Sequence, residues 1–119
     1  MAISNAYPYI TLQLSVGSYS LSFDAYVDSG FEGHVIVPAN LAENFGMPLL
    51  VSTWVLADGN AIHAPEYLGR VAVPEIDFEA VVRVTCLGEE FLLGRGILDR
   101  LRVTFDCGRR LAVERCLSR

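Results

Sequence analysis

Turn-forming residues recur every eight to twelve positions along the chain, and this spacing limits what the chain can fold into. They occur at Gly17-Ser18, Gly30, Gly33, Gly46, Asp58-Gly59, Pro74-Glu75, Gly88, Gly94, Gly96 and Gly108. The runs between them are short and rich in β-branched and aromatic residues, which is typical of a β-sandwich or a β-barrel. The sequence therefore predicts an all-β domain with at most two short helices.

The clearest strand covers 10–16, where apolar residues at every second position alternate with Thr11, Gln13 and Ser15. This period of two predicts a strand with one buried face. Further strands are predicted at 21–27, 35–37, 53–56, 61–65, 67–73, 78–86, 91–93, 101–105 and 111–113, and helical turns at 39–45 and 96–101. Asp58-Gly59 predicts a tight hairpin because both residues tolerate a positive φ.

The chain of 119 residues is predicted to form a single domain, 1–119, and is too short for an enzyme with two lobes. Its 52% hydrophobic content excludes a disordered chain, and its net charge of −5 argues against nucleic acid as a partner. The sequence shows no membrane-spanning stretch and no secretion signal. With an odd number of cysteines, these features lead us to expect a cytoplasmic protein with reduced thiols.

Metal and cofactor chemistry finds no support in the sequence. Cys86, Cys107, Cys116, His34 and His63 lack the close spacing of a zinc site, and no glycine-rich nucleotide-binding motif occurs. We therefore expect no metal and no cofactor, and we interpret the cysteines as buried or half-buried packing residues. The two histidines are expected to be ordinary surface or core residues, with a role in the pH response of a nearby site as the alternative.

The segment that carries chemical information is Asp28-Ser29-Gly30, in which a carboxylate directly follows a hydrophobic strand. Alone, such a tripeptide is a common turn. Two further features follow it in order, however: the Asp58-Gly59 hairpin and the segment Leu92-Leu93-Gly94-Arg95, which leads into a predicted helix.

This ordered set resembles the retropepsin-like aspartic proteases, and most closely their small bacterial members. The resemblance extends from about Ile10 to Val113 and includes Asp28-Ser29-Gly30-Phe31, Val37-Pro38-Ala39-Asn40-Leu41-Ala42, Leu56-Ala57-Asp58-Gly59 and Leu93-Gly94-Arg95-Gly96-Ile97-Leu98-Asp99. It implies a closed-barrel-like acid-protease lobe that acts as an aspartic endopeptidase on extended peptide segments.

The resemblance also assigns roles to individual residues. Asp28 is the implied catalytic carboxylate, Ser29 and Gly30 orient it, and Gly94 lies in the segment beside its loop. Glu32 and Arg95 are expected to form an ion pair that braces this loop, the alternative being two unrelated surface charges. The hairpin is the implied flap over the substrate, with these candidate binding residues: Trp54, Leu56, Asp58, Gly59 and Ile62. Trp54, Leu56 and Ile62, together with Val35, would line side-chain pockets or else belong to the core.

The chemistry of this family requires two carboxylates that share one proton. Only Asp28 is followed by Ser-Gly or Thr-Gly, so one chain supplies one carboxylate. The second must come from Asp28 of another copy across a two-fold axis, and a homodimer is therefore expected. The resemblance implies that the Asp28 loops, the flap tips and the terminal strands form the dimer contacts.

Three residues depart from the family pattern: Ser29 replaces the commoner threonine, Phe31 replaces the alanine of retroviral enzymes, and Gly96 replaces an Asp or Asn. Phe31 either narrows the substrate pocket or follows the bacterial pattern. Two other functions stay open at this stage. One is a non-catalytic retropepsin-like module for dimerisation or peptide binding, and the other is a β-barrel interaction domain in which Asp28-Ser29-Gly30 is only a turn.

Overall fold

The computed structural model describes residues 1–116 as an all-β fold. Its strands are β1 (Ala2–Ser4), β2 (Tyr9–Val16), β3 (Tyr19–Val27), β4 (Val35–Val37), β5 (Leu50–Val55), β6 (Ala61–Val73), β7 (Phe78–Cys86), β8 (Leu92–Leu93), β9 (Leu101–Asp106) and β10 (Arg110–Arg115). The helical segments are η1 (Ala39–Leu41), α1 (Ala42–Phe45), η2 (Pro74–Ile76) and α2 (Arg95–Leu98). None of the helices in this part of the chain has the length and apolar character needed to cross a bilayer.

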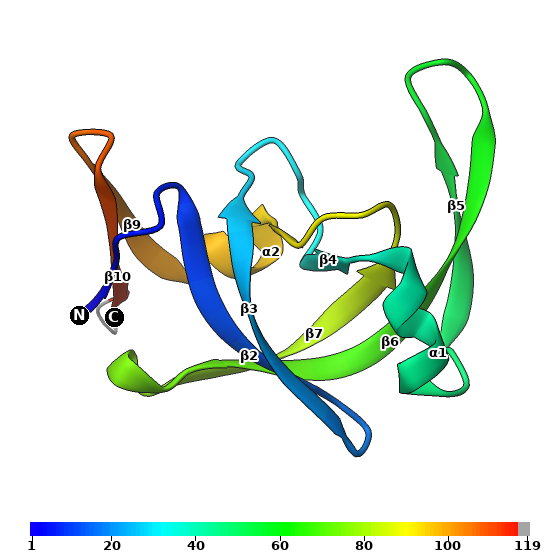
Figure 1. Cartoon of the computed structure of the whole chain (residues 1–119), viewed down its shortest axis with the longest axis horizontal. Coiled ribbons are helices and arrows are strands. Elements are labelled where there is room, and N and C mark those ends of the chain that lie inside the picture. Colours follow the sequence, from blue (N-terminus) through cyan, green and yellow to red (C-terminus); the bar gives the residue numbers. More distant parts are fainter. Residues whose placement is uncertain (117–119) are drawn as a thin grey trace.

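Six strands form a closed barrel in the order β2-β3-β8-β4-β7-β6, and β6 pairs back with β2 (Figure 1). The closing ladder pairs Leu14 with Val71. Two of the pairings are parallel, β3 with β8 and β4 with β7, and both join segments far apart in the sequence. The short strand β8 therefore lies between β3 and β4, and Val27 pairs with Leu93 immediately before Asp28.

Alternation along β2 and β3 explains why the barrel closes around one core. Along β2 every second residue is buried, as the sequence pattern predicts. The largest fully buried side chains include Leu12, Leu14, Leu93, Ile97 and Leu111. Burial of each such side chain stabilises a fold by about 1.5–3 kcal/mol. The core thus fixes the ends of β3 and β8, where the candidate site begins.

The terminal segments form a separate sheet with the order β1-β10-β9, at the left of Figure 1. β9 and β10 form the predicted final hairpin, and their turn places Cys107 and Gly108 at positive φ. β1 was not expected from the sequence, because three residues are too few to show a period of two. It forms by pairing Ala2 with Val113 in an antiparallel ladder.

Several expected boundaries are wrong for identifiable reasons. The runs 61–65 and 67–73 form one continuous strand, β6. Pro65 does not interrupt it, because this residue pairs with Val51 of the edge strand β5. The helix expected at 96–101 is only α2, since Leu101 already begins β9. In the β5–β6 turn only Gly59 has a positive φ, +87°. Asp58 instead accepts a hydrogen bond from the Asn60 N–H at 2.9 Å.

The cysteines divide differently from the expectation. Cys86 is buried and burial raises its pKa to about 11, which keeps it as an unreactive packing residue. Cys107 and Cys116 are exposed rather than buried or half-buried, because they lie in and after the terminal hairpin, outside the barrel core.

Candidate active site

Asp28 follows directly on β3 and is half-buried. Its backbone N–H donates to the Leu93 carbonyl at 3.0 Å, which extends the β3–β8 ladder by one step. One carboxylate oxygen, Oδ1, accepts a hydrogen bond from the Gly30 N–H at 3.0 Å. The backbone of its own loop therefore orients this carboxylate, and the part expected of Gly30 is present in the structure.

The Asp28 loop, residues 28–34, is bonded through its backbone to the segment that starts α2. The carbonyls of Phe31, Gly33 and His34 accept from the N–H groups of Arg95, Gly96 and Gly94 at 2.8, 2.9 and 2.8 Å. The bonded residues are sixty or more positions apart in the sequence. These bonds hold the two segments together, because each one gives a hydrogen-bond partner to a backbone N–H and to a carbonyl that would otherwise lack one.

Gly94 permits this close approach. A Cβ atom at this position would lie 2.4 Å from the Gly33 carbonyl oxygen and 2.5 Å from Cδ2 of Phe31. Both distances are far below any normal contact, and one of the atoms belongs to the backbone and cannot move aside. The glycine of the Leu-Leu-Gly-Arg segment is thus required where it crosses the Asp28 loop.

Glu32 and Arg95 form an ion pair, with Nη2 of Arg95 2.9 Å from Oε1 of Glu32. This contact confirms the expected pairing. The two side chains are 84% and 43% exposed, so the pair contributes at most about 1 kcal/mol. Within residues 1–116 the buried Nε of Arg95 has no hydrogen-bond partner.

Ser29 lies beside Asp28 with an exposed side chain. No side-chain hydrogen bond to Ser29 is present in the part of the chain that the structure describes. Orientation of Asp28 by Ser29 within one chain is therefore not observed. An exposed hydroxyl in this place is free to bond with a second molecule.

The β5–β6 hairpin, residues 50–65, meets the Asp28 loop through one aromatic contact. The ring of Trp54 lies 6.0 Å from the ring of Phe31, and its Nε1–H donates to Ser52 Oγ at 2.8 Å. Ile62 pairs with Trp54 across the hairpin and so shares its face. Leu56, Asp58 and Gly59 form the exposed tip, where the Gly59 N–H donates to the Leu56 carbonyl at 2.9 Å. Val35, by contrast, is fully buried and belongs to the core rather than to a pocket.

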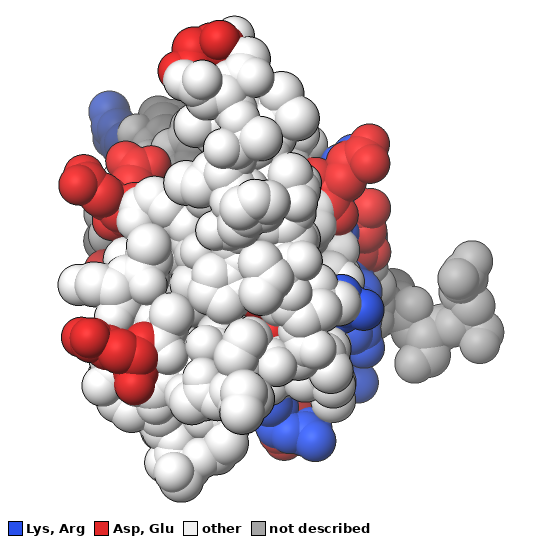
Figure 2. Space-filling model, turned by 90° about the vertical axis from the view of Figure 1, so that its right-hand side faces the viewer, with Lys and Arg blue, Asp and Glu red and all other residues white. Residues whose placement is uncertain are grey.

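The β5–β6 hairpin rises away from the barrel (Figure 1), and its side of the molecule is poor in charge. Figure 2 shows that charged side chains gather at the rim of this side and leave a broad uncharged centre. Apolar residues on the hairpin and just before it are strongly exposed, Met47 to 91% and Val55 to 75%. A surface of this kind suits contact with apolar or backbone groups of another chain.

The two histidines have different surroundings. His63 is exposed on β6, and its Nδ1 lies 3.2 Å from the Thr53 hydroxyl, as expected for an ordinary surface histidine. His34 is half-buried at the end of the Asp28 loop, and its Nδ1 accepts a hydrogen bond from the Arg83 N–H at 2.9 Å. Burial, and then the positive charges of Arg83 and Arg100, lower the pKa of His34.

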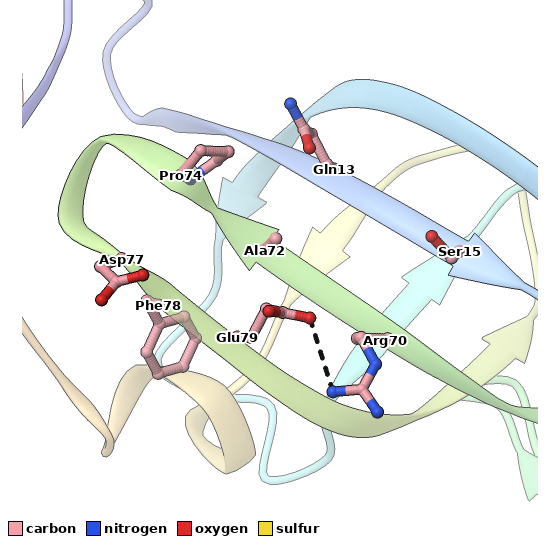
Figure 3. A pocket seen from close by; sticks show the side chains of 8 residues that line it. All are labelled: Gln13, Ser15, Arg70, Ala72, Pro74, Asp77, Phe78 and Glu79. Atoms are coloured by element: carbon pink, nitrogen blue, oxygen red, sulfur yellow. Dashed lines mark ion pairs between the residues drawn. The ribbon is translucent and has the colours of Figure 1, made fainter.

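A polar depression of about 370 Å³ lies between β2, β6 and β7 and includes no residue of the Asp28 loop or the β5–β6 hairpin (Figure 3). Across it, Arg70 and Glu79 form an ion pair at 3.5 Å, and Gln13 and Ser15 line one side. Both charged side chains are more than half exposed, so this depression is a solvated groove on the outside of the barrel.

Comparison with known proteins was made at three levels. No protein-family model matches the chain, and no curated protein matches it in sequence. Among solved structures, the crystal structure of a retropepsin-like aspartic protease from Rickettsia conorii is similar with a TM-score of 0.59. The match covers 94% of this chain and 96% of that one at 21% sequence identity. The chain has a retropepsin-like fold.

This result confirms the expected fold class, an all-β retropepsin-like lobe with a few short helices. In this lobe the structure brings together Asp28, Gly30, Glu32, Gly94 and Arg95, and it places Trp54 against the same loop. His34 also lies in this unit, where the sequence analysis expected an ordinary surface or core residue and kept a role in the pH response of a nearby site as the alternative.

Proposed function

We propose that this protein is an aspartic endopeptidase that acts as a homodimer. The observation that carries the proposal is the Asp28 carboxylate, which is oriented by the Gly30 N–H on a loop bonded to the Leu93–Gly96 segment of a retropepsin-like lobe. A plain turn would not require this close fit between two segments that are distant in sequence. The arrangement supplies one half of a two-carboxylate site.

In the proposed mechanism, the two Asp28 side chains of a dimer hold one proton between them. The ionised carboxylate takes a proton from water while the protonated one donates its proton to the scissile carbonyl oxygen. The resulting hydroxide attacks the carbonyl carbon and gives a tetrahedral diol. When the C–N bond breaks, the protonated carboxyl gives its proton to the leaving amine and the other carboxylate takes a proton from a diol hydroxyl, so the pair again holds one proton.

The substrate is proposed to be an extended segment of peptide or unfolded protein. Such a segment binds through its backbone and places alternate side chains in pockets. The β5–β6 hairpin would act as the flap, with Gly59 and Asp58 at its tip and Trp54, Leu56 and Ile62 toward the side chains of the substrate. The aromatic ring of Trp54, which lies 6.0 Å from the ring of Phe31, supports contact with a largely apolar segment on the side of the Asp28 loop.

Features of the single chain support a second copy as the partner. The Ser29 hydroxyl is exposed beside Asp28 and is accessible to a partner chain. β1 and β9 are the two edges of the terminal sheet, and Ile3 and Phe105 on them are exposed. Unpaired edges with apolar side chains are suited to pairing between chains.

The test replaces Asp28 by Asn and measures cleavage of an unstructured protein. We expect a loss of about 10²–10⁴-fold, because Asn can neither take nor give the proton. Asp24→Asn is the matched control: Asp24 lies on β3, the strand that leads to Asp28, is exposed, and accepts a hydrogen bond from the Thr11 hydroxyl at 2.6 Å outside the site. Wild-type activity in Asp28→Asn would contradict the catalytic assignment.

Subunit mixing tests the shared site. If each site needs two Asp28 residues, exchange of equal amounts of wild type and Asp28→Asn lowers the activity to about half that of the unmixed wild type, since only one dimer in four keeps both carboxylates. Unchanged activity after exchange, or an active monomer, would exclude the shared site. Binding of peptide by the dimer without cleavage would instead indicate the non-catalytic module.

A further inference from the structure

Gly96 departs from the family pattern, and the structure shows what takes the place of its side chain. A Cβ atom at Gly96 would lie 2.1 Å from Cδ2 and 2.8 Å from Nε2 of His34. The imidazole ring therefore fills the space that a polar side chain at position 96 would need. A side chain at position 96 would clash with the His34 ring and also with the Gly33 carbonyl oxygen, which would lie 2.9 Å from its Cβ atom.

The His34 side chain extends the β4–β7 ladder by one hydrogen bond, because its ring accepts from a backbone N–H of β7. β4 pairs with β7 in parallel and begins at Val35, which pairs with Val84. The N–H of the preceding β7 residue, Arg83, donates to Nδ1 of His34 at 2.9 Å. The His34 carbonyl accepts from the Gly94 N–H at 2.8 Å. One residue thus joins the end of the Asp28 loop both to β7 and to the segment before α2.

We propose that His34 is a positioning residue that holds the Asp28 loop in place only while its imidazole is neutral. Since Nδ1 accepts the Arg83 N–H, the single ring proton of the neutral form is on Nε2. Protonation places a second N–H on Nδ1, opposite the Arg83 N–H, and the bond is lost. The consequence for catalysis rests on the proposed function, whereas the bond itself does not.

The charges around His34 set the pH at which this happens. The positive charges of Arg83 on β7 and of Arg100 after α2 act on the ring, and Glu66 pairs with Arg83 at 3.3 Å. Burial and the two arginines lower the pKa of His34 below its ordinary value of 6.5. The unfolded chain therefore takes up the proton first as the pH falls. The stability contributed by neutral His34 is complete above pH 6.5 and is lost as the pH falls through the lowered pKa of the folded state.

The direct test is hydrogen exchange of the Arg83 amide. At pH 7, His34→Ala should lower the protection factor of this amide by about tenfold, the effect of one lost hydrogen bond. Val82 and Val84, which pair with β6, are internal controls and should change little. His34→Asn keeps an acceptor near the position of Nδ1 and cannot be protonated, so it should protect Arg83 equally at pH 7 and pH 5.

The wild-type Arg83 amide should lose its protection as the pH falls below 6.5 and through the lowered pKa of His34, whereas His34→Asn should keep it. His63→Asn is the matched control, because His63 is exposed and should not affect Arg83. Equal protection of Arg83 in wild type, His34→Ala and His34→Asn at both pH values would overturn the proposal. Should His34→Ala not fold, the comparison of wild type with His34→Asn decides the matter, since only the wild-type ring can be protonated and equal protection of Arg83 in both at every pH would overturn the proposal.

Cleavage assays then test the consequence for the site. The activity of the wild type should fall on the acid side, and His34→Asn should move this fall to lower pH. An identical acid limb in both proteins would overturn the positioning role. If the wild type cleaves nothing at any pH, the proposed function fails, and Arg83 exchange still decides the role of His34.

Discussion

The Asp28 loop and the β5–β6 hairpin lie on two sides of the candidate site and are held in different ways. Backbone hydrogen bonds of 2.8–3.0 Å join the loop to Leu93–Gly96. The hairpin is bonded within itself, and the Phe31–Trp54 ring pair joins it to the loop. Segments with few tertiary contacts open most easily. We expect the loop to stay fixed while the hairpin moves, as a site with fixed chemistry and a moving cover requires.

The largest effect on stability is expected from Gly94→Ala, which disturbs the packing of the Asp28 loop against the Leu93–Gly96 segment. The added methyl group would clash with the Gly33 carbonyl at 2.4 Å, so the Asp28 loop must separate from α2. We expect a loss of about 3 kcal/mol in the free energy of unfolding, at the upper end for overpacked sites. Denaturant unfolding at one protein concentration measures this change.

Gly59→Ala is the matched control for Gly94→Ala on the moving side. Nothing lies within 4 Å of a Cβ atom at Gly59, so the cost is that of a side chain at φ +87°, about 1–2 kcal/mol and confined to the hairpin. Equal destabilisation by the two substitutions would contradict the contrast between a fixed loop and a free hairpin.

A smaller effect is expected from Trp54→Ala, which removes the contact between the two regions. Aromatic pairs contribute about 0.5–1.5 kcal/mol beyond their buried area, and Trp54 is only half-buried. We expect a loss of about 1–2 kcal/mol and faster amide exchange in β5, with exchange in the Asp28 loop unchanged. Faster exchange in both regions would show that the hairpin supports the loop.

The same contrast explains which features the sequence could predict. The alternating strand β2 and the turn at Asp58-Gly59 are local patterns, and local patterns can be read without knowing the partner. Asp28, Gly94 and the Glu32–Arg95 pair were found through resemblance, because three motifs occur in order. The fixed side of the site was therefore largely predictable in its residues, although not in its hydrogen bonds.

Long-range pairing accounts for the features that were missed. The sequence predicts the strand at 91–93, but not the place of β8 between β3 and β4, which follows from contacts distant in sequence. His34 and Arg83 are 49 positions apart, and their bond joins a side chain to a backbone N–H, which every residue except proline carries. The residue type at position 83 therefore does not indicate this hydrogen bond. The glycine at position 96 is the related sequence feature, because the His34 ring lies where a side chain would be.

The smallest effect is expected from Glu32→Gln, although its ion pair is the most visible side-chain contact of the Asp28 loop. Glu32 is 84% exposed, and backbone hydrogen bonds hold the loop without it. We expect a loss of about 0.5 kcal/mol at low salt that vanishes near 1 M salt, as for other exposed pairs. Glu79→Gln removes the similarly exposed Arg70–Glu79 pair on the outside of the barrel and should cost the same. A loss of unfolding free energy in Glu32→Gln several times that in Glu79→Gln, and still present in high salt, would contradict this view. It would mean that the ion pair, and not the backbone hydrogen bonds, holds the Asp28 loop.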